Sequence, residues 1–273
     1  MASLFSFRTP NGTGRRLTGT ARFSELLGRD FNRFFTVNLF TLLGFLPFTL
    51  GALAAILSSS ILVLIPACVL GGALAGPSLS CMYDAIFRSL RDAPGKCMEN
   101  YRRAWKQNWR QAVIPGIIFC LFLGCYAFML MLFWWSKTAP GSGTVALFFV
   151  SLTLFTMFFS LYWPQLVLFE QSRTQRFKNC LLFMIRFFWK TLGCALLQIA
   201  YWAFLLLFLP WSAVLLVLTG FWFILFAENF LLYNTLNKIF CIEEQIAQDF
   251  PEQAPFYEDD EAWLKRKQEE ERI

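Results

Sequence analysis

The stretch GPSLSCMYDAIFRSLRDAPGKCMENYRRAWKQNWR, residues 76–110, decides the fold. It leaves an apolar run, ends one helix near Arg91–Gly95, and opens a second helix that is basic and aromatic. Long segments without charge lie on both sides of it. Basic and aromatic residues next to such segments are typical of a membrane interface. The stretch therefore predicts a basic elbow at the cytoplasmic face of a membrane, between two spans.

The composition excludes a single soluble core. Of the 273 residues, 57% are hydrophobic and only 15% are charged, and 33 are phenylalanine. A soluble domain carries roughly 25% charged residues. The predicted fold class is therefore an all-α integral membrane protein, a six-transmembrane helical bundle.

Six apolar segments are long enough to cross a hydrocarbon layer of about 30 Å at about 1.5 Å per helical residue. The predicted spans are 34–57, 61–83, 112–135, 145–169, 191–209 and 211–227 within a membrane domain 34–240, with cytoplasmic elbows at 84–111 and 170–190. Residues 1–33 are predicted to be a basic cytoplasmic segment and 241–273 an acidic cytoplasmic tail.

The distribution of cations predicts the orientation. Of the 24 lysines and arginines, 23 fall in alternate segments between the spans, and the three remaining connections carry only Lys137. Cytoplasmic loops are enriched in lysine and arginine. Both termini are therefore expected in the cytoplasm, and the external loops are expected to be short turns.

An aromatic and basic stretch precedes each outward span, at 29–34, 105–110 and 186–190. One interpretation is three repeated helical hairpins. The other is that any span entering a basic interface shows tryptophan and arginine there.

The sequence gives no sign of an enzyme. It has no histidine, its eight cysteines form no CxxC pair, and no Walker, dinucleotide-binding, HExxH or GxSxG motif occurs. We expect no catalytic residue, no cofactor, no metal site and no nucleic acid partner. The lipid bilayer is the expected environment.

Polar residues in or near the spans are the candidate functional residues, because burying one in lipid is costly. We expect Asn38, Gln165 and Gln198 to make hydrogen bonds between helices. The charged candidates form a predicted polar cluster at the cytoplasmic mouth of the bundle: Asp84, Arg88, Glu170, Arg173 and Glu228. The alternative is simple pairing, since Asp84 and Arg88 are four residues apart and Glu170 and Arg173 are three apart.

Gly72, Gly76 and Pro77 are predicted helix-packing residues, because Gly72 and Gly76 form a GxxxG motif. Small residues let two membrane helices approach closely. Packing within the bundle, homodimerisation, a lined cavity and a flexible hinge remain open as uses of this motif.

The helix after the elbow carries a predicted interfacial or docking surface. Tyr101, Trp105 and Trp109 recur every four residues and so share one face. The cations beside them are Arg102, Arg103, Lys106 and Arg110. One interpretation is anchoring among lipid headgroups, and the other is docking of a cytoplasmic partner.

Four segments carry a family resemblance: residues 75–79, 82–84, 88–92 and 101–111. With the phenylalanine-rich opening segment, they resemble the YesL-like family of bacterial membrane proteins, which are built on a domain of unknown function. The resemblance covers about two thirds of the chain and is vague in the last two spans. This chain has a fuller first hairpin than shorter members and an acidic tail.

The resemblance implies that the protein lies in a bacterial cell membrane and takes part in carbohydrate uptake. Genes of the family often lie beside sugar-importing ABC transporters, which implies an accessory role in carbohydrate uptake, with a transporter permease as the expected partner. No catalytic residues are established for the family. The alternative function is a small transporter or channel in its own right, as repeated hairpins and Gly/Pro-broken spans occur in such folds.

Overall fold

The computed structural model describes residues 17–93, 95–135 and 140–244, and these residues form eight helices. In chain order the helices are α1 (Gly19–Leu57), α2 (Ile61–Leu90), α3 (Cys97–Trp135), α4 (Ser142–Leu168), α5 (Arg173–Arg186), α6 (Phe188–Leu207), α7 (Ser212–Leu218) and α8 (Gly220–Phe240). The predicted basic segment before residue 17 and the acidic tail after residue 244 lie outside the described residues.

The fold is an all-α membrane bundle of the predicted class. In the described part of the chain, five helices are long and apolar enough to cross a membrane, and the bent pair α7–α8 makes a sixth if it forms one span. On α1, Leu43, Leu46, Leu50 and Leu53 are exposed, while Phe45, Phe48 and Ala52 are buried. A large exposed leucine stripe suits contact with lipid chains, so the chain is a multi-pass membrane protein in contact with the bilayer.

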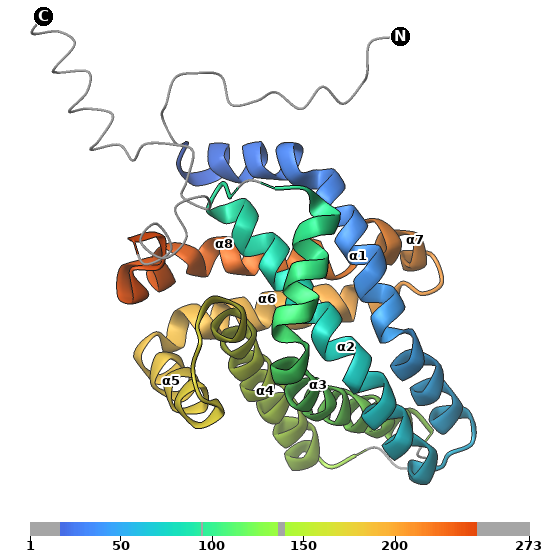
Figure 1. Ribbon diagram of the computed structural model, residues 1–273. Coiled ribbons are helices and arrows are strands. Elements are labelled where there is room, and N and C mark those ends of the chain that lie inside the picture. The colour runs from blue at the N-terminus through green and yellow to red at the C-terminus, as the bar shows by residue number, and fades with distance from the viewer. Residues whose placement is uncertain (1–16, 94, 136–139, 245–273) are drawn as a thin grey trace, which may run out of the picture.

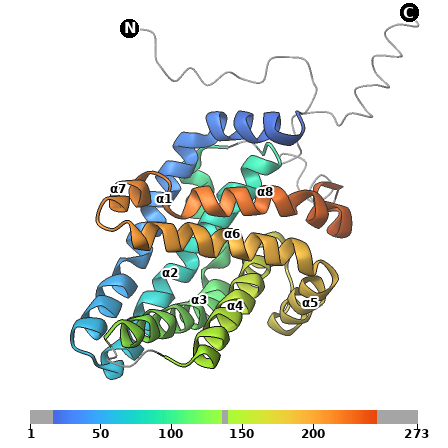
Figure 2. The ribbon, with the colours of Figure 1, turned by 180° about the vertical axis from the view of Figure 1, so that it is seen from behind.

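The helix ends separate onto two sides of the bundle (Figure 1 and Figure 2). The start of α1, the connection between α2 and α3, helix α5 and the end of α8 lie toward one side. The α1–α2 turn, the end of α3 with the start of α4, and helix α7 lie toward the other. This separation is the one that alternating spans require.

Helices α1, α2 and α3 form the most closely packed part of the bundle. A Cβ atom on Gly76 would lie 2.3 Å from the Ala112 carbonyl oxygen of α3, and one on Gly72 would lie 2.6 Å from the Ile117 Cα. On α3, a Cβ on Gly116 would lie 2.4 Å from the Gly72 carbonyl oxygen. The GxxxG glycines therefore bring two backbones together within the bundle, and Pro77 is buried beside them in an unbroken α2.

Two elements differ from the simple pattern of spans. Helix α1 begins at Gly19 rather than near Phe34, because Arg22, Leu26 and Asp30 continue its buried stripe at intervals of four. The last span is not one straight helix: α7 and α8 meet at Thr219 with a bend of 62°. Hydropathy alone could not locate this bend, because the residues on both sides of it are apolar.

Candidate functional site

Six charged side chains join the start of α1 to the connection after α2, and we call them the elbow cluster: Arg22, Glu25, Arg29, Asp30, Arg33 and Asp92. Arg22 and Arg29 both form ion pairs with Asp92. Arg29 also pairs with Asp30 at 2.8 Å, and the Ser89 hydroxyl donates to Asp30 at 2.6 Å. The side chains of Arg22 and Asp92 are only 6% and 1% exposed.

The geometry of the elbow cluster follows from the local backbone. Arg22 and Arg29 are seven residues apart, so they lie on one face of α1 two turns apart. Asp92 has a φ of 58° just after α2 ends. Aspartate tolerates this left-handed conformation better than most residues, and its carboxylate meets both guanidinium groups of α1. The cluster therefore fixes the α2–α3 connection to the first helix.

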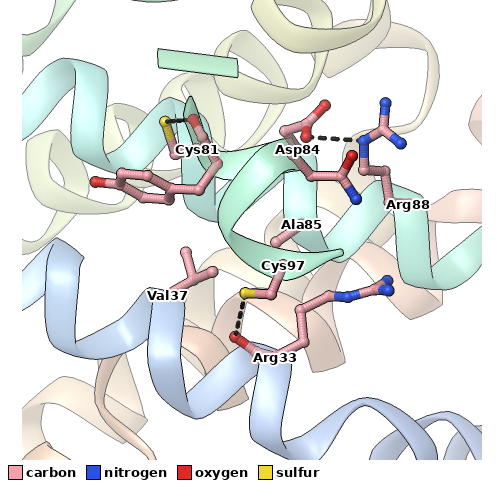
Figure 3. A pocket seen from close by; sticks show the side chains of 9 residues that line it. Arg33, Val37, Cys81, Asp84, Ala85, Arg88 and Cys97 are labelled. Atoms are coloured by element: carbon pink, nitrogen blue, oxygen red, sulfur yellow. Dashed lines mark hydrogen bonds and ion pairs between the residues drawn. The ribbon is translucent and has the colours of Figure 1, made fainter. Parts of the chain in front are cut away.

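Asp84 and Arg88 lie beside this cluster on α2. The Arg88 Nε donates to the Asp84 carboxylate at 3.0 Å, as simple pairing at a spacing of four predicts. Figure 3 shows the two side chains at a small cleft that Arg33 and Cys97 also line. The cleft holds about 10 Å³ of free space, about the room of one water molecule. It is far too small for a sugar.

The guanidinium of Arg91 lies buried at the end of α2, where its Nε donates to the Phe87 carbonyl oxygen at 3.1 Å. Burial lowers the pKa of Arg91, and the negative charge of Asp84 opposes that shift. The cations and carboxylates of the elbow thus act on one another as one charged layer.

The predicted docking surface lies on the first half of α3. Tyr101 stacks on Trp105 at 6.2 Å between ring centroids and also contacts Phe40 of α1 at 5.0 Å. Trp109 is exposed, and the Arg110 guanidinium lies 5.6 Å from its ring centroid. Arg102, Arg103 and Lys106 line an open, shallow depression together with Glu99 and Gln107. We call these three cations the docking face.

The structure does not bring all members of the predicted polar cluster together. Asp84 and Arg88 form a pair, but Glu170 and Arg173 are both exposed, and no ion pair joins them in the part of the chain that the structure describes. Glu228 lies within the bundle, completely buried on α8. Of the predicted cluster, the described residues therefore join Asp84 and Arg88 as an ion pair.

The Asn38 side chain forms hydrogen bonds with backbone atoms on both sides of the bend between α7 and α8. Its amide nitrogen donates to the Val217 carbonyl oxygen at 3.0 Å, and its amide oxygen accepts from the Phe221 N–H at 2.9 Å. The Tyr201 hydroxyl of α6 donates to the Gly220 carbonyl oxygen at 2.9 Å. Broken membrane helices need such partners for their freed backbone groups. The hydrogen bonds between helices expected of Asn38 are thus made to backbone atoms.

The two glutamines of the spans are also in the interior or near it. Gln165 is fully buried and its Nε2 lies 3.2 Å from the Cys180 sulfur. Gln198 accepts a long hydrogen bond of 3.5 Å from the Ser160 hydroxyl, which links α6 to α4. Both make contacts between helices.

Sequence reasoning missed Arg176, which is completely buried on α5. It donates to the Gln111 side chain at 2.9 Å and to the Gln171 carbonyl oxygen at 3.2 Å, and it lies over the Tyr162 ring. The available signal was its position: Arg176, Cys180 and Phe183 form the buried stripe of α5, so the arginine lies on the apolar face.

The described residues contain no group of three or more histidine, cysteine, aspartate or glutamate side chains that could hold a metal ion. The arrangement offers charge complementarity at the elbow, an exposed cationic face on α3, and a single buried carboxyl, Glu228, inside the bundle. Comparisons with protein-family models, curated proteins and solved structures found no match to this chain.

Proposed function

We propose that this protein is a non-catalytic accessory subunit that docks to another membrane protein through the docking face of α3. The observation that carries the proposal is the exposed position of Arg102, Arg103 and Lys106 on a helix whose start is held by the elbow cluster. A rigid cationic surface beside a membrane suits an acidic cytoplasmic loop of a partner, because complementary charge steers docking.

The elbow carboxylates support a structural role. Asp30, Asp84 and Asp92 are each bound by at least one guanidinium group. Charge-assisted hydrogen bonds of this kind are strong and fix the position of both side chains. We therefore assign these groups to holding the elbow in place.

We further propose that the partner is the permease of a bacterial carbohydrate ABC transporter, with both termini and the docking face in the cytoplasm. This part rests on the resemblance to the YesL-like family and on the distribution of the 24 lysines and arginines along the sequence.

The test is co-purification in mild detergent followed by mass spectrometry. A variant with Arg102, Arg103 and Lys106 all replaced by glutamate should lose a permease that the wild type retains. The matched control replaces three exposed cations of α5 by glutamate: Arg173, Lys178 and Arg186. This control variant should retain the permease. Recovery of the wild type always alone, or of the same permease with both variants, would contradict the proposal.

A second candidate is a small transporter or channel, and the bend between α7 and α8 favours it. Discontinuous helices form substrate sites in many transporters. Here the side chains of Asn38 and Tyr201 donate hydrogen bonds to backbone carbonyl oxygens at the break between the two helices. Purified protein in liposomes would be tested for flux of sugars. No flux of any sugar tested would exclude sugar transport by the isolated chain.

A further inference from the structure

The most unusual polar group of the interior is the carboxyl of Glu228, the only acidic side chain of α8. Glu228 is completely buried, with an exposed fraction of 0%. Neither carboxyl oxygen has a hydrogen-bond partner among the described residues. Buried polar groups are nearly always paired, so each exception requires an explanation such as a bound ion or water.

The groups facing Glu228 come from several helices. Tyr83 of α2 and Cys194 of α6 interact with it electrostatically. The Ser160 hydroxyl of α4 also lies near the carboxyl, but it donates to the Gln198 side chain at 3.5 Å. From α1, Phe23 and Phe34 pack against Phe226 of α8. Helix α7 carries no titratable residue. The surroundings therefore contain hydroxyl, thiol and aromatic groups.

Two cations of the neighbouring helices make their hydrogen bonds to other groups. The Lys190 amine of α6 donates to the Thr235 hydroxyl at 3.0 Å, and Thr235 is seven residues beyond Glu228 on α8. Arg176 binds Gln111 and Gln171. In the described ranges no salt bridge reaches Glu228. An unpaired carboxylate in an apolar interior is so unfavourable that such a group takes up a proton instead.

A bound metal ion explains the site less well. Hard cations are held by several oxygen ligands, with carboxylates prominent among them, and Glu228 belongs to no cluster of acidic or cysteine side chains in the described part of the chain. A proton needs one carboxyl oxygen and no additional ligand.

We propose that Glu228 is a proton-binding site in the membrane interior, where α2, α4, α6 and α8 meet, and that it holds one proton at neutral pH. The step is the addition of a proton from water to one carboxylate oxygen. The site lies eight residues beyond Gly220, about 12 Å along α8 from the bend. Ionisable groups inside membranes are commonly parts of proton pathways. This inference goes beyond the docking role and does not depend on it.

Infrared spectroscopy of the purified protein in detergent tests the proposal, because a protonated carboxyl has a carbonyl stretching band that a carboxylate lacks. At neutral pH the wild type should show this band, with a shift in heavy water. Glu228→Gln should lack it. The matched control Glu170→Gln, which removes an exposed carboxyl, should retain it.

Glu228→Asp provides a second assignment if Glu228→Gln does not fold, because it keeps a carboxyl and should move the band without removing it. The proposal is overturned if the wild type has no such band at neutral pH, or if the band is unchanged in the Glu228 variants. It is also overturned if sodium at constant pH abolishes the band, since a metal ion would then occupy the site.

Discussion

At the residue scale, Asn38 shows how one amide stabilises a broken span. Asn38→Ala would leave the Val217 carbonyl and the Phe221 N–H without their partner. We expect a loss of about 1–3 kcal/mol in the free energy of unfolding, measured by thermal unfolding in detergent. Thr49→Ala, at an exposed position of the same helix, should change stability by at most about 0.5 kcal/mol. Equal losses in the two variants would contradict this role for Asn38.

Cysteine reactivity offers a second test at this scale. Cys180 is 0% exposed, and burial raises the pKa of its thiol to about 12. Cys241, at the end of α8, is exposed. Because the thiolate is the reactive form, a maleimide at neutral pH should modify Cys241 rapidly and Cys180 only after denaturation. Peptide mapping by mass spectrometry measures both. Modification of the two cysteines at similar rates in the folded protein would show that α5 is not packed as described.

At the scale of elements, the crossing of α2 and α3 depends on the absence of side chains. A Cβ on Gly76 would approach the Ala112 carbonyl oxygen to 2.3 Å, so Gly76→Ala must move one backbone. We expect a loss of about 1–3 kcal/mol in unfolding free energy. Gly193→Ala in α6 has open space around its Cβ and should be neutral or stabilising by up to about 1 kcal/mol. Thermal unfolding compares them, and a stable Gly76→Ala would argue against this close crossing.

The elbow cluster predicts a strong effect of a single charge. Asp92→Asn keeps a residue type that tolerates a positive φ, but it removes the carboxylate that Arg22 and Arg29 share. Removing one partner of a buried ion pair costs about 3–5 kcal/mol. The measurement is the midpoint of unfolding in detergent.

The matched control for Asp92 is Glu99, which pairs with Lys96 at 3.5 Å. The Glu99 side chain is 71% exposed and the Lys96 side chain is 84% exposed. Glu99→Gln should be nearly neutral, because surface ion pairs contribute little. If Asp92→Asn unfolds at the same temperature as Glu99→Gln, the elbow cluster does not hold α1 to the α2–α3 connection.

At the scale of the whole molecule, hydropathy and charge predicted the class of fold. Runs of apolar residues located the helices, and the GxxxG spacing indicated that Gly72 and Gly76 pack against another helix. The partner of these glycines could not be predicted, because a single sequence does not say which helix faces which. The bend at Thr219 was hidden for a similar reason: Asn38, almost two hundred residues earlier in the chain, supplies the hydrogen bonds that stabilise it.

The candidate site was predicted less well than the fold. The spacing of four joined Asp84 to Arg88, but Arg22 and Asp92 meet across 70 residues, which no local spacing indicates. Glu228 was predicted to belong to a cluster of charges, and the sequence did not indicate that α8 would bury it completely. Long-range packing determines these environments.

Topology labelling tests most directly whether the bundle crosses the membrane six times with both termini in the cytoplasm. Two variants would each carry one new cysteine, at the exposed position Ser59 or Ser142, with the exposed Cys125 and Cys241 replaced by serine. A third variant would keep Cys241 and replace only Cys125. A membrane-impermeant maleimide should label positions 59 and 142 in intact cells, and Cys241 only after the cells are opened. Labelling of Cys241 in intact cells, or different behaviour of positions 59 and 142, would contradict this topology.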